Sequence, residues 1–308
     1  HLNTLMKKKN ESSEQLNIQL FLLCMLAALL CRRLGKISSL RIICGMLRTM
    51  IYVGVYIGWG ISIYKRVIQK SVRNVLIFIA ELIIFWFVVR TTKYFFTMDN
   101  QIARYLWYSY YIPMLFIPVA VLQAAFFLGK SEEYRLPKWL KGVYIPTAVL
   151  VLLVLSNDLH QLVFSFPVGS AWSDSHYTYG WGYYVVLIWE VVCALTAFVL
   201  MIYKCRHSQK KKYLPLFGIG AAVLYAVLFI SGVAWVQEIG GDITAVLCLF
   251  FVGILESCVR CGLIQTNTGY DQLFEVCTLG AQITDQNYNV CYASANAMPL
   301  SKKTMKDA

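Results

Sequence analysis

The sequence predicts an all-α polytopic membrane protein, built as a seven-transmembrane helix bundle. The chain of 308 residues is 58% hydrophobic and only 14% charged, whereas a soluble domain usually carries about 25% charged residues. Several apolar runs approach the roughly 20 residues that a helix needs to cross a bilayer. The formal net charge is +12, but the basic residues lie mainly between these runs, as topology signals do. We therefore expect membrane lipid as a partner and no nucleic acid.

The first apolar run, at 16–31, is short for a membrane span. Basic residues precede it at 7–9 and follow it from Arg32. A basic head before a short apolar core is typical of a signal peptide, but no small-x-small cleavage site follows. The run is either one extra N-terminal span or a helix at the membrane interface. We assign it to an N-terminal segment, 1–41.

Seven further runs predict the bundle, which we assign to a sensor domain over 42–264. They lie at 47–64, 74–96, 105–128, 143–156, 183–203, 214–235 and 243–262. No internal repeat is visible, which disfavours the repeat architecture of many transporters.

The charges of the loops predict the orientation of the bundle. Lysine and arginine cluster at 65–73, 130–141 and 204–212, whereas the loops 157–182 and 236–242 contain none. Positive residues favour the cytoplasmic side, so these basic loops and the C-terminus should be cytoplasmic. The basic residues at 32–41 then fall on the outer side. Either the first run does not span, or the N-terminal topology differs.

The residues after the last run follow a different pattern. Two short alternating segments, 281–284 and 290–293, flank turn residues at 285–289. This arrangement predicts a β-hairpin. We expect residues 265–308 to be a linker and the start of a soluble module that is too short to be complete.

Three glutamates, Glu81, Glu190 and Glu256, lie within or near apolar runs. Glu190 lies about two turns inside the fifth predicted span, and intramembrane carboxylates often mark functional positions. The alternative is a protonated acid that is bonded to a neighbouring helix. Glu256 precedes Arg260 by four residues, so the two side chains can form an ion pair on one helix face. That spacing favours a structural role.

The long outer loop, 156–184, carries acids, histidines and many aromatic residues but no basic residue. Asp158 and His160 could bind a metal or sense pH, or they could cap the helix end. A metal site needs further ligands, so none is predicted. The Tyr and Trp residues also suit an interfacial belt. Asp242 suits the N-terminus of the last span, where free N–H groups attract a carboxylate.

Trp107 and Tyr110 belong to an aromatic cluster at 104–118, in the outer part of the third predicted span. The prolines at 113 and 118 can kink this helix. The cluster is either an interfacial belt beside a kink or one wall of an outward-facing ligand pocket. The sequence contains no GxxxxGK[ST], HExxH or GxSxG motif. We therefore predict no catalytic residue and no cofactor.

Several short stretches, taken in order, resemble the N-terminal seven-transmembrane sensor region of bacterial histidine kinases. They are NDLHQLVF (157–164), YTYGWGYY (177–184), GDIT (241–244) and RCGLIQTNTGY (260–270). The stretch LGAQITDQNYNVCYASANA (279–297) is similar to the first strands of a PAS domain.

The resemblance implies the signal-input region of a two-component sensor kinase in the bacterial plasma membrane. Such a region would work as a homodimer through cytoplasmic domains and would reach a response regulator through the full-length protein. The chain lacks the phosphoacceptor helix and the ATP-binding domain, so it should not be an enzyme by itself. The cue would be an unknown small molecule or a state of the membrane.

The family pattern and the residues above together define the predicted sites. We hypothesise that the ligand contacts are Asn157, His160, Tyr179, Trp181, Glu190 and Asp242, with Trp107 and Tyr110 opposite. We expect Glu256 and Arg260 to transmit the signal, with the last helix continuing through Arg260 towards the PAS start.

Three alternatives remain open at this point. The same module resembles those that precede diguanylate cyclases, so the output domain could be a cyclase. The chain could also be a small transporter or lipid-handling protein. A third alternative is an anchor that only dimerises an output domain.

Overall fold

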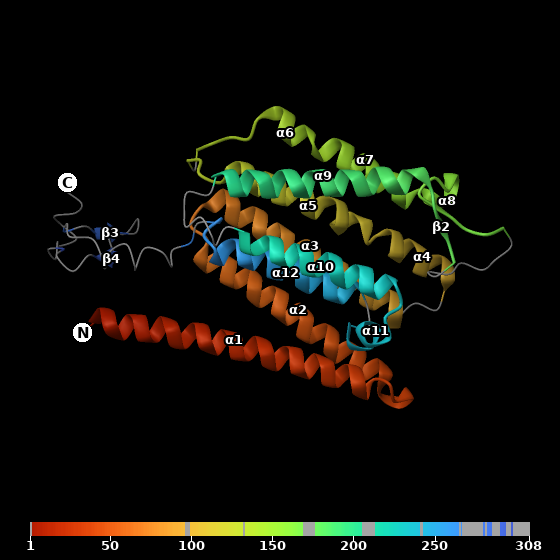
Figure 1. Ribbon diagram of the computed structural model, residues 1–308, viewed down its shortest axis with the longest axis horizontal. Helices are drawn as coiled ribbons and strands as arrows, with labels where there is room; N and C mark the ends of the chain where they lie inside the picture. The colour runs from red at the N-terminus through yellow and green to blue at the C-terminus, as the bar shows by residue number, and fades with distance from the viewer. Residues whose placement is uncertain are drawn as a thin grey trace.

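The computed structural model describes residues 2–95, 99–131, 133–168, 176–204, 213–240, 243–264, 266, 280, 282–284, 290–293 and 297. The helices are α1 (Leu2–Leu34), the 3-10 helix η1 (Ser38–Leu40), α2 (Arg41–Arg66), α3 (Lys70–Phe95), α4 (Asn100–Tyr108), α5 (Tyr111–Phe127), α6 (Lys138–Gly142), α7 (Tyr144–Leu155), α8 (Asn157–His160), α9 (Trp181–Lys204), α10 (Leu214–Ile230), α11 (Ala234–Gly240) and α12 (Ile243–Arg260). Strands β1 (Phe164–Ser165) and β2 (Thr178–Tyr179) pair antiparallel, as do β3 (Gln282–Thr284) and β4 (Val290–Ala293). Figure 1 shows the long helices side by side along one axis.

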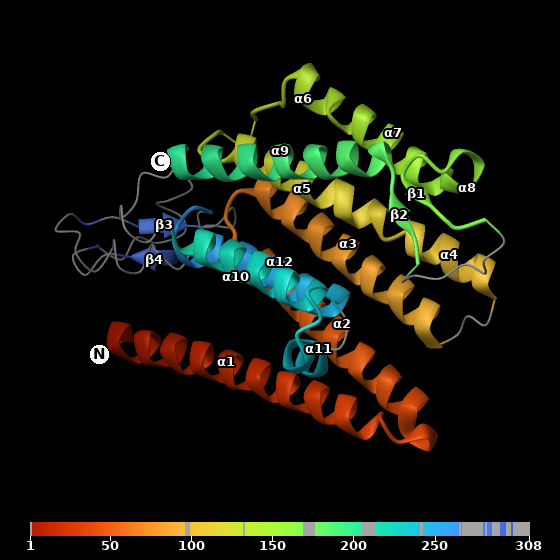
Figure 2. The same cartoon turned by 45° about the vertical axis from the view of Figure 1, so that its right-hand side comes forward.

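The described residues contain seven helical segments that are long and apolar enough to cross a membrane. They are Leu16–Leu34, Arg41–Arg66, Lys70–Phe95, Asn100–Phe127, Lys138–Leu155, Trp181–Lys204 and Ile243–Arg260. This result confirms the predicted multi-pass helical bundle. The set differs from the predicted one, because α10 is shorter than a typical span and the end of α1 qualifies. Helix α1 lies along α2 in both views (Figures 1 and 2), as a spanning helix would.

The bundle has two distinct ends. Strands β3 and β4 and the start of α1 lie at one end, which we call the tail end (Figure 1). Helices α8 and α11, the β1–β2 hairpin and the turn between α1 and α2 lie at the other, the hairpin end. The basic residues of this turn therefore lie opposite the tail end, as the alternation of the predicted spans implied.

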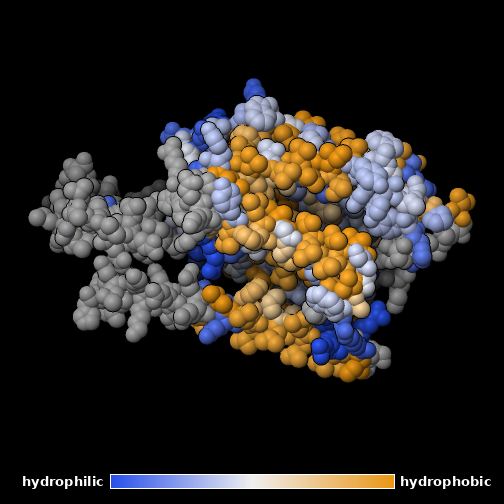
Figure 3. Space-filling view, viewed as in Figure 1, coloured by the Kyte–Doolittle hydropathy of each residue, from blue (hydrophilic) through white to orange (hydrophobic). Residues whose placement is uncertain are grey.

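The interior is formed mainly by α2, α3, α5 and α12. Ile79, Ile83, Ala120 and Ala124 are fully buried there. By contrast, many large apolar side chains of α9 and α10 are exposed. Figure 3 shows hydrophobic residues over the middle of the bundle and hydrophilic residues towards its ends. Exposed apolar side chains in this position suit contact with lipid.

The third predicted span is not one helix. It is divided into α4 and α5, with Ser109 and Tyr110 between them. Pro113 lies in the first turn of α5, where its missing N–H breaks no helical hydrogen bond. Pro118 lies inside α5. The division lets α4 bring a separate set of side chains to the hairpin end.

The last helix, α12, runs through Arg260 and ends there, two residues before the predicted end of the span at 262. Gly262 has a positive φ of 79°. Its N–H donates to the Val259 carbonyl over 3.3 Å, and the Ile264 N–H donates to the Cys258 carbonyl over 3.1 Å. This pattern is a Schellman-type helix end, which favours glycine in the left-handed region. Leu263 and Ile264 are then buried in the core.

The predicted C-terminal hairpin is present. Ile283 pairs with Tyr292 between antiparallel β3 and β4. Its identity as the start of a PAS domain stays a prediction, as do the boundaries at 41, 42, 264 and 265.

Candidate functional site at the hairpin end

Asn157 organises the loop at the hairpin end. Its side chain is fully buried. Its Oδ1 accepts from the N–H groups of Val163 and Phe164, both at 3.0 Å. Its Nδ2 donates to the Phe164 carbonyl at 2.9 Å and to the Tyr108 hydroxyl at 3.1 Å. All these partners belong to the protein, so the geometry favours a positioning role. The predicted ligand contact stays a prediction.

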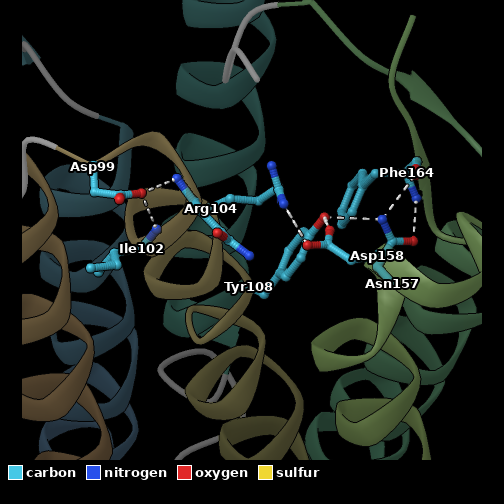
Figure 4. Close-up of polar contacts among 8 residues, drawn as sticks. Asp99, Ile102, Arg104, Tyr108, Asn157, Asp158 and Phe164 are labelled. Carbon is cyan, nitrogen blue, oxygen red and sulfur yellow. Dashed lines mark hydrogen bonds and ion pairs between the residues drawn. The ribbon is translucent and has the colours of Figure 1, made fainter. Parts of the chain in front are cut away.

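Asp158 joins this loop to α4 (Figure 4). Its Oδ2 accepts from Arg104 Nε at 3.0 Å and from Arg104 Nη2 at 2.6 Å. Its Oδ1 accepts from the Tyr108 hydroxyl at 2.8 Å. Asp99 caps the same helix, because its Oδ1 accepts from the Ile102 N–H at 3.2 Å. The position of α4 therefore fixes the partners of Asp158.

The surroundings of Asp158 favour its ionised form. Partial burial alone would raise the pKa of Asp158, but the hydrogen bonds from Arg104 and Tyr108 and the charge of Arg104 lower it below the usual range. A lowered pKa in the folded protein means that this carboxylate stabilises the fold above the ordinary Asp pKa of about 3.9. That contribution is lost as the pH falls through the lowered pKa.

We predict a pH test of this pair with Asp158→Asn. At pH 7 the free energy of unfolding of the variant should be lower by about 1–2 kcal/mol. This figure is reduced because solvent screens a partly exposed ion pair. Wild type should lose this advantage at acid pH, because its carboxylate becomes protonated. The measurement is the thermal unfolding midpoint of both proteins between pH 7 and pH 2. A constant difference over this whole range would contradict the role of the carboxylate charge.

His160, the last residue of α8, caps the C-terminal end of α7. Its Nδ1 accepts from the Leu162 N–H at 3.0 Å. Its Nε2 lies 3.1 Å from the Leu153 carbonyl and 3.2 Å from the Ser156 hydroxyl. Because Nδ1 accepts here, Nε2 is the ring nitrogen that can donate to the Leu153 carbonyl. Of the two alternatives for His160, the geometry therefore favours the helix cap.

Phe164 is the centre of an aromatic cluster that includes four more rings: Trp107, Tyr111, Tyr177 and Tyr183. It is fully buried, and their centroids lie 4.6, 5.6, 5.5 and 5.9 Å from its own, respectively. We call these five residues the aromatic cluster. Offset and edge-to-face rings at such distances stabilise one another. The cluster joins α4, α5, β1, the residue just before β2, and α9.

Gly180 allows this hairpin to lie against the loop. Its N–H donates to the Val163 carbonyl at 2.9 Å, and a Cβ atom at this position would lie 2.0 Å from the Leu162 carbonyl oxygen. The contact is with backbone, which cannot rotate away. The absence of a side chain at Gly180 and Gly182 thus permits this close approach of backbone to backbone.

The other predicted ligand contacts differ in exposure and in their position relative to the aromatic cluster. Tyr179 stacks on Tyr183 with centroids 4.1 Å apart and is 49% exposed. Trp181 is 61% exposed at the start of α9. Tyr110 is buried beside Trp86 of α3, away from the aromatic cluster. Asp242 lies outside the described residues.

Glu190 lies deeper in the bundle, on α9. It is close enough to Tyr111 and Tyr183 to act on them electrostatically. Its buried Oε1 has no hydrogen-bond partner among the described residues. Carboxyl groups at membrane depth usually face the bundle interior. Glu190 therefore lies near two tyrosines of the aromatic cluster, and its role as a ligand contact stays a prediction.

Reasoning from sequence did not assign three residues that organise this site. Arg104 and Tyr108 hold Asp158, and Phe164 centres the aromatic cluster. The only signal in the sequence was their place in the stretches 104–118 and 157–164. The pairing of these two stretches depends on the contact between α4 and the loop after α7.

A second polar cluster lies at the tail end, around Glu256 of α12. Its two oxygens accept from Arg66 Nη1 and Nη2 at 2.9 and 2.7 Å. They also accept from Arg260 Nε at 2.9 Å and from Trp59 Nε1 at 3.2 Å. The expected pair with Arg260 is present, but the cross-helix partner Arg66 was not predicted. We call these four residues the Glu256 cluster; it connects α12 with α2.

These features define a class of protein: a multi-pass helical membrane protein with a polar and aromatic site at one end and a charged helix junction at the other. In the described part of the chain, no three His, Cys, Asp or Glu side chains are grouped to hold a metal ion.

The family follows from comparison with known proteins. Residues 20–259 match the family described as the N-terminal 7TM region of histidine kinase, and the chain belongs to this family. The matched region begins inside the first apolar run, in α1. No curated protein and no solved structure gave a match.

Proposed function

We propose that this chain is the signal-input region of a two-component sensor histidine kinase of the bacterial plasma membrane. The family match over residues 20–259 carries this proposal. In this account the tail end and the C-terminus are cytoplasmic. Phosphotransfer belongs to kinase domains that this sequence does not contain, which would act as a homodimer and on a response regulator. The 308-residue chain alone is then not an enzyme.

The cue would act at the hairpin end. Tyr179 and Trp181 are exposed there. Trp107 is half-buried in the aromatic cluster, whose central ring, Phe164, also contacts Tyr179. Asn157 and His160 hold the loop that supports these aromatic residues. A small molecule or a change of the membrane at this surface could therefore alter the aromatic cluster without disrupting the whole bundle.

The signal would reach the tail end by a change of helix contacts. Helix α9 packs on α5, α5 on α3, and α3 on α2. The Glu256 cluster then ties α2 to α12, and Val67 at the end of α2 forms a β-bridge with Thr266. A cue can favour one arrangement only by its differential affinity for the two. These contacts support α2 and the segment after α12 as the output path.

We predict that Tyr179→Ala weakens the response of the full-length kinase to its cue by about tenfold, as the loss of one stacked, exposed ring in a binding site would. The matched control is Tyr184→Ala, because Tyr184 is equally exposed and next to the same ring, Tyr183. The measurement is autophosphorylation against cue strength, with thermal stability measured in parallel. Equal losses in both variants would contradict a specific role for Tyr179.

One experiment tests the proposed function as a whole. Residues 20–264 of the full-length protein are replaced by an unrelated dimeric transmembrane anchor. Loss of the response with retained basal kinase activity is the expected result. A retained response would mean that the bundle is only an anchor. Cyclase activity in place of autophosphorylation would favour the diguanylate cyclase alternative.

A further inference from the structure

A basic cavity lies at the hairpin end, where α1 meets α2 and α3. Its volume is about 330 Å³. Its cationic lining residues are Arg32, Lys36, Arg41, Arg48 and Arg90. None of the described residues that line it is acidic. In Figure 3, hydrophilic residues gather at the lower right, where Figure 1 places α11 and the turn between α1 and α2.

Close contact between α2 and α3 fixes one wall of this cavity. Gly45 and Phe95 both line it, and a Cβ atom on Gly45 would lie 2.2 Å from the Phe95 ring. One turn further along, the hydroxyls of Thr49 and Thr91 are 2.9 Å apart. Arg90 is only 3% exposed. The cavity is therefore formed by packed helices and not by a surface loop alone.

Helix α11 supplies a carboxylate at the rim. Glu238 accepts a hydrogen bond from Lys36 over 2.9 Å. Arg32 donates to the backbone carbonyls of Glu238 and Gln237 at 2.7 and 3.1 Å. Carbonyl groups orient a guanidinium but carry no net charge. Among the described residues, the rim thus carries one carboxylate beside five cationic lining residues, and a surplus of positive charge at one cavity attracts anions.

We propose that this basic cavity binds an anion that carries a phosphate group. Guanidinium groups bind phosphate through paired, charge-assisted hydrogen bonds, and arginine supplies four of the five cations. The phosphate comes either from an anionic lipid headgroup or from a soluble phosphate compound. Exposed apolar side chains beside the cavity, Ile37, Ile42 and Ile43, provide a surface for lipid acyl chains. The proposal concerns binding and does not depend on the kinase assignment.

The test uses the purified 308-residue chain in neutral detergent. Its thermal unfolding midpoint is measured with added phosphatidylglycerol, phosphatidylcholine or inorganic phosphate. Phosphatidylglycerol should raise the midpoint and phosphatidylcholine should not. A rise with inorganic phosphate as well would identify a soluble phosphate as a sufficient ligand. No rise with either phosphatidylglycerol or inorganic phosphate would overturn the proposal.

Two variants of opposite effect locate the binding. Arg41→Gln with Arg48→Gln should weaken the apparent affinity for the active probe by at least about tenfold. Glu238→Gln should strengthen it by about threefold, because it removes the competing carboxylate from Lys36. The control is Arg135→Gln, an exposed arginine near the tail end, which should bind as wild type does. Unchanged affinity in Glu238→Gln would overturn the proposal even if the double variant fails to fold.

Discussion

Replacing Asn157 by alanine is expected to lower the free energy of unfolding by about 3–4 kcal/mol, which is large for a single substitution. The substitution removes four hydrogen bonds at once. The N–H groups of Val163 and Phe164 and the Phe164 carbonyl then lose their hydrogen bonds to Asn157, and both of these residues are buried. Buried polar groups that lose their partners keep their desolvation cost, so the loop should lose its fixed conformation next to α4.

The measurement is denaturation of the purified chain in mixed micelles. The matched control is Asn100→Ala, because Asn100 is exposed at the start of α4, and its substitution should change stability by less than about 0.5 kcal/mol. Full-length kinase with Asn157→Ala should also lose its response to the cue. A variant that is as stable as the control would contradict the positioning role of Asn157.

Replacing Arg66 by glutamine is expected to have the second large effect, by separating α2 from α12. Arg66 and Glu256 are about one-fifth exposed, and they share two short hydrogen bonds. Loss of this partly buried pair should cost about 2–3 kcal/mol. In the full-length kinase it should also change the basal output, because the tie between the two helices is lost.

Arg260→Gln is the matched control for this prediction. Arg260 binds the same carboxylate, but it belongs to the same helix and is 47% exposed. Its loss should cost less than about 1 kcal/mol and should leave the basal output nearly unchanged. The comparison uses unfolding free energy and autophosphorylation without a cue. Equal effects of both substitutions would contradict a specific role of the connection between α2 and α12 in stability and basal output.

The bundle itself could be predicted from sequence because apolar length is a local property. Runs such as 74–96 and 183–203 became α3 and α9 with small shifts at their ends. The C-terminal hairpin and the pair of Glu256 with Arg260 were also predictable, because turn residues and i,i+4 spacing act over a few positions. Features without a recognisable local sequence pattern could not be predicted. The break at Ser109 and the Gly262 turn after α12 were not predicted.

The candidate site could be predicted only in part because its contacts join distant segments. Arg66 and Glu256 are 190 positions apart, and no periodicity indicates which helix faces meet. The same holds for Arg104 with Asp158. Buried Asn157 shows a further limit: the sequence pattern singled it out, but its four internal hydrogen bonds became visible only in the folded loop.

The most direct test of the output path is a disulfide between Val67 and Thr266. These residues form an antiparallel β-bridge, and such a pair brings two Cα atoms to about 4.5–5.5 Å, within reach of a disulfide. Val67→Cys and Thr266→Cys are combined in full-length kinase after Cys258 and Cys261 have been replaced by alanine. The rate of disulfide formation is measured with and without the cue. The account predicts rates that differ severalfold between the two output states; equal rates would contradict it.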